Sequence, residues 1–491
     1  MPLFRSDIML LNIKSVTMKK NALNPFGSNY ACRLPENLDK ILQEHPFTPS
    51  FHKGNPIAIK DRLALVLDML MSSLSIQWSQ GEDKDCYANL CSAILQDLVR
   101  DYNRYLAYAV EVGIIEKGEN YIVGQKCTSY RFTEVYRTSR RLRDQYIYET
   151  VLVKKIWSHI RDLEAIKKYQ HLFDQLYHLS VDWLEAEEIL KKLYGKDEFR
   201  KKELQRDTLR RLEDPERWTF KTGETGRLYT PISNLNKKLR KALRYNGEPL
   251  VGLDIKNSIP YFSLALFDAA NYRRLGIEEL IFKNNDRLRR RYDRYDEDKE
   301  REEKGEGRTR KTHPLVMLVD FQNELDEIPD LKEFVELVKS GELYELLMVL
   351  FNIPDRTEAK KKFLAILNAP SHWESQRRES LVIRFPRLMK VIELLNEGYY
   401  KTKKGIGKGE TKIKWQPGDQ VCTFAYVTQQ LEARFVLDVV CKAIEEEHPE
   451  VPMLTLHDCI FTTPEYFRLV HSYMARLAIE FMGFAPRIEV K

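Results

Sequence analysis

The sequence predicts an α+β protein of more than one domain. At 491 residues, of which 43% are apolar, the chain exceeds what one hydrophobic core usually organises and has enough apolar residues for several. Long stretches repeat apolar residues with the spacing of an amphipathic helix. Two short apolar runs in the C-terminal half, Leu250–Ile255 and Met453–Thr463, have the character of strands. Helices and a small sheet are therefore expected to share one core there.

Composition and motifs exclude several classes of protein. The longest strongly apolar stretch, Leu63–Met71, contains Asp68 and is far shorter than the roughly 20 residues that span a bilayer. Arg5 and Asp7 interrupt the N-terminal apolar residues, so no secretion signal is expected. We therefore expect a cytoplasmic protein without a membrane partner. The 7 cysteines form no CxxC pair, and neither HExxH nor GxxxxGK[ST] occurs, which argues against zinc ribbons, zincins and P-loop ATPases.

The N-terminal third is expected to contain an arm and a small domain. Residues 1–58 carry scattered Pro and Gly without a sustained period, which is typical of an arm. Residues 59–140 begin with helical spacing and continue into a basic hairpin, in which Tyr121–Val123 and Tyr130–Phe132 are the expected strands. Helices followed by such a hairpin indicate a winged-helix-like domain.

Basic and aromatic residues alternate in that hairpin. The basic residues Lys126 and Arg131 are suited to contact a nucleic-acid backbone. The neighbouring aromatic residues Tyr121 and Tyr130 are suited to stack on bases. The alternative is a domain used for protein contacts or simple core packing. The net charge of +6 is compatible with a nucleic-acid partner but does not require one.

Composition changes twice more along the chain. Residues 141–221 are helical in pattern and heavily charged, which predicts an extended helical lobe. Residues 222–491 mix strand-like runs with long helical patterns. Inside this part, residues 285–313 are almost wholly charged and are expected to be a solvated helix or loop, and residues 400–415 form a basic, Gly-bearing hairpin.

Two aspartates lie inside the strand-like apolar runs. Asp254 stands in PLVGLDI and Asp458 stands in LTLHDCIF. A buried carboxylate without a partner costs several kcal/mol, so two of them in one domain require compensation, which a divalent cation would supply. The alternative for either residue is a strand end that faces water or an arginine.

A helix is expected from Arg356 onwards, with Asp355 as its N-cap. Arg356 and Lys360 lie on one face of that helix, in its first turns. Like charges at this spacing repel mildly, and both the charges and the helix dipole favour an anion there. A triphosphate would satisfy this arrangement, whereas the alternative is an ordinary solvated basic face.

These features belong to a series of five elements in a fixed order. They are TGRLYTPISNLNKKLRKAL (Thr225–Leu243), LVGLDIKNSIPYFSLALF (Leu250–Phe267), RTEAKKKFLAILN (Arg356–Asn368), VTQQLEARFV (Val427–Val436) and LTLHDCIFTTPE (Leu454–Glu465). This order resembles the family A DNA polymerases and the related single-subunit, phage-type RNA polymerases. The resemblance covers about residues 222 to 491. It implies a right-hand polymerase palm with helical fingers, and a thumb formed by the preceding helical lobe.

The resemblance also implies roles for the catalytic residues. Asp254 and Asp458 would hold two Mg²⁺ ions, with Mn²⁺ as an alternative and the Ile255 carbonyl as a further ligand. Arg356 and Lys360 would bind the phosphates of a nucleoside triphosphate.

Other positions would contact the nucleotide or the nucleic acid. Leu364, Asn368 and Ile259 would line the nucleotide site, where Asn368 stands in place of the family's usual tyrosine. Arg227 would touch the duplex near the primer end, and the residues expected beside the primer terminus are His457 and Gln429.

The expected function is therefore template-directed nucleotidyl transfer on a DNA primer-template, with RNA as the alternative template. No acidic cluster resembling a 3′–5′ exonuclease precedes the helical lobe, so we expect a DNA polymerase without proofreading, from a mobile element. One alternative is an RNA polymerase or primer-making relative. Another is a DNA-binding replication initiator with a degenerate palm, although such a protein would have no need to keep Asp254 and Asp458.

Overall fold

The structure is a computed structural model of the chain. It describes residues 29–38, 56–79, 86–90, 92–118, 128–139, 141–195, 198–267, 271, 274–282, 329–369, 375–396, 402–404, 411–413 and 424–491. No helix in these ranges is long and apolar enough to cross a membrane. The described residues combine helices with several small sheets, in agreement with the expected α+β class.

The N-terminal elements share one hydrophobic core around a long helix, α2 (Pro56–Ser79). Its buried residues Leu63, Leu67 and Leu70 follow the helical spacing that the sequence predicts. The surrounding elements are β1 (Tyr30–Pro35), β2 (Ala88–Asn89), α3 (Ser92–Leu98), α4 (Tyr102–Glu111), β3 (Ile115–Lys117), β4 (Ser129–Phe132), α5 (Glu134–Arg137), β5 (Leu142–Ile147) and α6 (Thr150–Ile160). Strand β1 pairs with β5, and β2, β4 and β3 form a three-stranded antiparallel sheet.

One strand of the expected basic hairpin is present. Strand β4 pairs with β3, which the sequence analysis did not name, so that Ile115 lies opposite Phe132. The expected strand at Tyr121–Val123 lies outside the described residues, whereas the strand through Tyr130 is confirmed. Four described helices, α2 to α5, and a three-stranded sheet are compatible with a winged helix, which stays a prediction.

The N-terminal core continues beyond residue 140, where the sequence placed a boundary. Strand β5 pairs with β1 along its length, and Trp157 of α6 donates a hydrogen bond from Nε1 to the Asn29 carbonyl over 3.2 Å. Residues of β5 and α6 in this core are Ile147, Leu152, Val153, Ile156 and Trp157. Part of the expected arm is therefore a strand of the N-terminal domain, and the domain extends through α6.

A second and larger core starts in the middle lobe and continues to the C-terminal end of the chain. The lobe comprises α7 (Leu163–Lys168), α8 (Gln170–Gln175), η2 (Leu176–His178), β6 (Leu179–Val181), α9 (Trp183–Leu193), α10 (Phe199–Leu212) and η4 (Pro215–Arg217). Asp182 caps α9 by accepting a hydrogen bond from the Glu185 amide over 3.1 Å. Phe173 packs edge-on against Phe220, with ring centroids 5.1 Å apart. These contacts join the helical lobe to the chain that leads into the C-terminal region.

The C-terminal region is built on a four-stranded antiparallel sheet in the order β14-β15-β11-β16. Its strands are β11 (Val251–Ile255), β14 (Leu454–Leu456), β15 (Cys459–Thr462) and β16 (Ile488–Val490). Both strand-like runs of the sequence are thus confirmed as neighbours in one sheet. Gly252 lies so close to the adjacent strand that a Cβ there would be 2.9 Å from the Phe461 ring.

Short elements lead into this sheet. They are β7 (Lys221–Thr222), β8 (Leu228–Tyr229), η5 (Pro231–Asn234), η6 (Lys237–Ala242), β9 (Leu243–Tyr245) and β10 (Glu248–Pro249). Strands β7 and β8 form a hairpin around the TGR sequence, whereas β9 pairs with β6 of the middle lobe.

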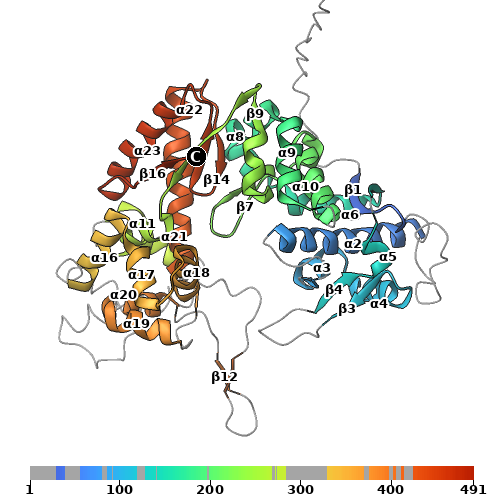
Figure 1. Ribbon diagram of the computed structural model, residues 1–491, viewed down its shortest axis with the longest axis horizontal. Helices are drawn as coiled ribbons and strands as arrows, with labels where there is room; N and C mark the ends of the chain where they lie inside the picture. Colours follow the sequence, from blue (N-terminus) through green and yellow to red (C-terminus); the bar gives the residue numbers. More distant parts are fainter. Residues whose placement is uncertain are drawn as a thin grey trace, which may run out of the picture.

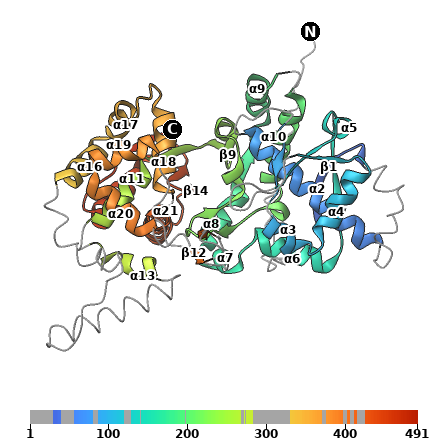
Figure 2. The same cartoon turned by 90° about the horizontal axis from the view of Figure 1, so that it is seen from below.

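Helices surround the sheet and form a further group beside it. They are α11 (Ser258–Ser263), η7 (Leu264–Phe267), α13 (Ile277–Phe282), α16 (Pro329–Ser340), α17 (Leu343–Phe351), α18 (Arg356–Leu367), α19 (Gln376–Arg384), α20 (Pro386–Asn396), α21 (Phe424–Ala433), the π-helix η10 (Arg434–Cys441), α22 (Lys442–Glu447) and α23 (Phe467–Met482). Strands β12 (Thr402–Lys404) and β13 (Thr411–Ile413) pair antiparallel within the expected basic hairpin, and the charged residues 285–313 lie outside the described residues. In Figures 1 and 2, α9 and α10 lie between this C-terminal region and the N-terminal elements around α2.

Candidate active site

Asp254 and Asp458 lie at the same end of neighbouring strands. Asp254, near the end of β11, faces Cys459, the first residue of β15. His457 and Asp458 form the tight turn between β14 and β15, in which His457 has a positive φ of 55°. The Ile255 amide donates a hydrogen bond to the Asp458 carbonyl over 3.1 Å. The pairing of two strands far apart in the sequence thus brings both carboxylates to one edge of the sheet.

The two carboxylates repel one another. Burial raises the pKa of Asp254, and the negative charge of Asp458 raises it further, because each disfavours a second charge at this place. The Lys491 ammonium group forms an ion pair with Oδ2 of Asp254 and acts in the opposite direction. The environment of Asp254 therefore favours a cation beside its carboxylate.

The donor set fits Mg²⁺. This ion is usually bound by one or two carboxylates, with the remaining positions filled by water and substrate phosphates. Asp254 and Asp458 supply two hard oxygen donors, and Ile255 ends the same strand as Asp254. In the described part of the chain, no group of three or more His, Cys, Asp or Glu residues is arranged to hold a metal by itself. The two carboxylates can therefore supply part of the ligands of such an ion.

The TGR hairpin packs against the Asp458 turn and α21. The Tyr229 and His457 rings meet at 73°, with centroids 5.5 Å apart. Gln430 of α21 donates a hydrogen bond to the Glu224 carbonyl over 2.8 Å. Burial lowers the pKa of His457 to about 4, helped by the positive charge of Arg227. The imidazole is therefore neutral at pH 7, and it can donate one hydrogen bond and accept another.

A third carboxylate, Glu432, belongs to this cluster, and the sequence analysis missed it. The Glu432 side chain is fully buried on α21, and its Oε1 accepts a hydrogen bond from Nε of Arg227 over 2.7 Å. Burial raises the pKa of Glu432 to about 7, although Arg227 opposes this shift. The sequence signal for Glu432 is an acidic residue among apolar residues on a helix that is buried. Arg227, expected to touch the duplex, is therefore also the partner of a buried acid.

The α18 helix carries the expected basic face. Asp355 caps it by accepting a hydrogen bond from the Glu358 amide over 2.7 Å. Both cations lie over the ring of Tyr344, with Arg356 5.0 Å and Lys360 5.8 Å from its centroid. Nε of Arg356 also donates to Glu345 over 2.8 Å. The shared face is confirmed, and the carboxylate of Glu345 occupies one side of Arg356.

Glu345 of α17, the partner of Arg356, also interacts with a cation beside β11. Burial raises the pKa of Glu345, but its hydrogen bond with Arg356 and the positive charges of Arg356 and Lys256 lower it overall. Lys256 directly follows β11, so a positive charge at the end of this strand acts on Glu345 of α17.

The remaining predicted nucleotide positions, together with Gln429, which is expected beside the primer terminus, lie on three helices. Ile259 is the second residue of α11, half-buried against the large core. Leu364 is half-buried on α18, and the exposed Asn368 ends this helix by donating from Nδ2 to the Leu364 carbonyl over 2.8 Å. Gln429 is half-buried on α21. The roles of these residues toward a substrate stay predictions.

The two residues predicted to bind nucleic acid in the N-terminal domain have different outcomes. Lys126 lies outside the described residues. Arg131 donates to Glu116 over 2.8 Å and lies 4.4 Å from the centroid of the Tyr87 ring. These contacts hold the Arg131 guanidinium within its own sheet, so a backbone phosphate would have to compete with Glu116.

Comparisons with known proteins give little further information. No protein-family model matches the chain, and no curated protein matches it. One similar solved structure is the POL domain of Pol1 from M. smegmatis in complex with DNA primer-template and dNTP, with 12% identity and a TM-score of 0.26. The match covers 88% of this chain and 65% of the other, so the chain spans less than two thirds of that protein's length. A similarity at this level carries no argument about function.

Proposed function

We propose that the protein catalyses template-directed nucleotidyl transfer, as a DNA polymerase without proofreading that serves a mobile element. The observation that carries this proposal is the convergence of Asp254 and Asp458 at one edge of an antiparallel sheet. The order of the five sequence elements supports it, and so does the packing of the TGR hairpin beside the Asp458 turn.

The proposed reaction uses the carboxylate pair and the cations of α18. Asp254 and Asp458, with the Ile255 carbonyl, would hold two Mg²⁺ ions, which when bound activate the primer 3′-hydroxyl and stabilise charge on the pyrophosphate leaving group. Arg356 and Lys360 would bind the β- and γ-phosphates, because charge-assisted hydrogen bonds to phosphate favour such a pair. The phosphates would then displace Glu345 from one side of Arg356.

The cluster around Glu432 would hold the primer end. His457, neutral at pH 7, offers a hydrogen-bond donor without adding charge, and Gln429 offers an amide. Arg227 would reach the duplex while its Nε stays bound to Glu432, since the guanidinium has donors on several sides. Glu432 would thus fix the direction of Arg227.

An RNA polymerase or primer-making relative is the alternative that one observation favours. Asn368 is exposed at the end of α18 and uses its Nδ2 on the helix, which leaves its Oδ1 able to accept a hydrogen bond from a ribose hydroxyl. A replication initiator with a degenerate palm is opposed by the paired carboxylates, because DNA affinity alone does not need them.

Extension of a labelled primer on a DNA template tests the proposal. We expect extension with Mg²⁺ and deoxynucleotides, none with EDTA, and no removal of a mismatched 3′ end. Extension that is faster with ribonucleotides, or that occurs on an RNA template only, would favour the alternatives. DNA binding without extension under any metal would favour the initiator.

Removing the α18 cations should impair nucleotide use more than DNA binding. Arg356→Ala or Lys360→Ala removes a charged hydrogen bond of roughly 1.5–3 kcal/mol, so we expect about a tenfold to hundredfold rise in nucleotide KM or fall in kcat/KM. Lys362→Ala, an exposed lysine on another face of α18, is the matched control. Equal losses in primer-template affinity and turnover would instead assign these cations to the nucleic-acid backbone.

The sugar preference should depend on Ile259. Its branched side chain would place an apolar group against a ribose 2′-hydroxyl. That hydroxyl would then be buried without a hydrogen-bond partner, which costs about 1–3 kcal/mol. We therefore expect Ile259→Gly to increase ribonucleotide incorporation about tenfold or more, and Ile259→Val, which keeps the branch, to change it little. Single-nucleotide incorporation with dNTP and rNTP side by side measures this. Faster rNTP use by the unmodified protein would contradict it.

A further inference from the structure

A polar cavity lies where the N-terminal core meets the middle lobe, and none of Asp254, Asp458, Arg356 and Lys360 lines it. Its volume is about 490 Å³. Its walls come from α2, from α10 and from residues 230–237, which follow the TGR hairpin. The volume is many times that of a water molecule, whose share of liquid volume is about 30 Å³, and it lies within the range of small-molecule sites.

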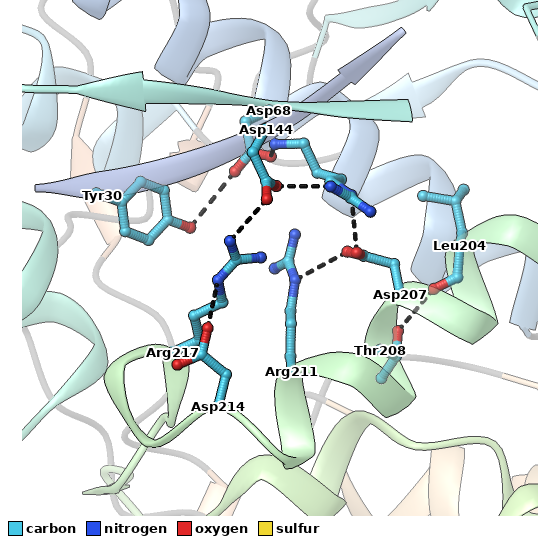
Figure 3. Close-up of polar contacts among 10 residues, drawn as sticks. Tyr30, Asp68, Asp144, Leu204, Asp207, Thr208, Arg211, Asp214 and Arg217 are labelled. Atoms are coloured by element: carbon cyan, nitrogen blue, oxygen red, sulfur yellow. Dashed lines mark hydrogen bonds and ion pairs between the residues drawn. The ribbon is translucent and has the colours of Figure 1, made fainter. Parts of the chain in front are cut away.

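Three arginines form one wall, and aspartates hold each of them in place (Figure 3). Arg33 and Arg217 both donate to Asp144, over 2.7 and 2.9 Å. Arg211 donates to Asp207 through Nε over 3.0 Å. Figure 3 shows the guanidinium of Arg211 at the centre of this group, between Arg217 and Asp207.

Cationic residues outnumber acidic ones among the residues that line the cavity, and Asp144 and Asp214, which pair with its arginines, do not line it. The cationic residues that line the cavity are Arg33, Arg211, Arg217 and Lys237, and the acidic ones are Asp68 and Asp207. Burial raises the pKa of Asp68, and the positive charge of Arg211 acts in the opposite direction. Guanidinium groups that carboxylates hold in fixed directions are suited to bind phosphate by paired hydrogen bonds.

One buried oxygen atom at the cavity, Oε1 of Gln205, has no hydrogen-bond partner in the described part of the chain. Gln205 is only 4% exposed and lines the cavity from α10. A buried polar atom without a partner costs about 1–3 kcal/mol, so the site is incomplete without a polar ligand or water.

We propose that this cavity binds a phosphate ester of nucleotide size, with Arg211 and Arg217 on the phosphate and Gln205 on a hydroxyl or amino group of the ligand. A bare anion would use the cations and leave the Gln205 oxygen without a donor. The ligand would also touch Thr230, three residues after Arg227, so its binding is placed to act on the TGR hairpin.

Calorimetric titration tests this site separately from the candidate active site. The probes are ATP, dATP and pyrophosphate in EDTA, added to the Arg356→Ala/Lys360→Ala protein so that the α18 site does not contribute. We expect one nucleotide per chain, and at least tenfold weaker binding after Arg211→Gln or Gln205→Leu. Arg210→Gln is the matched control, because Arg210 is the exposed neighbour of Arg211 on α10.

A second variant keeps the test valid if Arg211→Gln fails to fold. Ser72 is exposed on α2 and lines the cavity, so Ser72→Trp should fill it from the surface and leave the ion pairs intact. Loss of nucleotide binding in Ser72→Trp would support the proposal. It would be overturned if none of the three probes bound, if binding survived both Ser72→Trp and Gln205→Leu, or if only a single-stranded oligonucleotide bound.

Discussion

Asp254→Asn and Asp458→Asn are each expected to abolish Mg²⁺-dependent primer extension, by about a thousandfold or more. Such a loss corresponds to about 4 kcal/mol of transition-state stabilisation, which is what the loss of a bound metal would remove. An amide keeps the shape of the side chain but loses the charge that holds a divalent ion. Primer-template affinity should change little, because these groups would meet the metal and not the duplex.

Stability measurements distinguish this loss from unfolding. Burial and Asp458 raise the pKa of Asp254, so a neutral Asn at position 254 removes repulsion, and the unfolding temperature should not fall. Lys491 loses its partner, but its side chain is 37% exposed and can be hydrated. Glu465→Gln, which changes an exposed acid just after β15, is the control and should retain extension. Undiminished extension by either aspartate variant would rule out the proposed site.

The strands of the candidate site could be predicted from the sequence, but not their pairing. An aspartate within a short apolar run is visible in each of the segments around Asp254 and Asp458. Their convergence depends on the register that places Asp254 opposite Cys459, and such long-range pairing has no local signal. The order of the five sequence elements does group Asp254 and Asp458 into one predicted site, because each aspartate belongs to one of these elements.

The contacts that the sequence did not predict are also non-local. Strand β1 joins β5 across more than a hundred residues, so a boundary placed from local composition at residue 140 cut through one core. Glu432 looks like a polar residue of an ordinary helix, because helical periodicity does not show which acid will be buried. Only the packing of α21 against the TGR hairpin reveals it as the partner of Arg227.

The burial of Glu432 should make stability depend on pH. The ordinary pKa of a glutamate, 4.5, rises to about 7 in the folded protein, so the folded state binds more protons than the unfolded state between these values. The contribution of Glu432 to stability is therefore fully present below about pH 4.5 and is lost as the pH rises through 7, by on the order of 3 kcal/mol.

Glu432→Gln should remove this dependence, because a glutamine resembles the protonated acid and does not titrate. We expect its unfolding midpoint in urea to match that of the unmodified protein at pH 5 and to exceed it at pH 8. Glu446→Gln, which changes an exposed acid of α22, should follow the unmodified protein at every pH. Parallel curves for Glu432→Gln and the unmodified protein would contradict the raised pKa.

Arg227→Ala should show the opposite behaviour and a larger effect. The Arg227→Ala change leaves the fully buried Glu432 carboxylate without its cation. Breaking a buried ion pair in this way costs about 3–5 kcal/mol. Protonation of Glu432 relieves that cost, so the destabilisation should be small at pH 5 and greatest at pH 8. Arg227→Ala/Glu432→Gln should recover most of the lost stability at pH 8 but not primer extension, since the proposed contact with the duplex belongs to Arg227. If the double variant were as unstable as Arg227→Ala, the arginine would stabilise the fold by packing and not by compensating a buried charge.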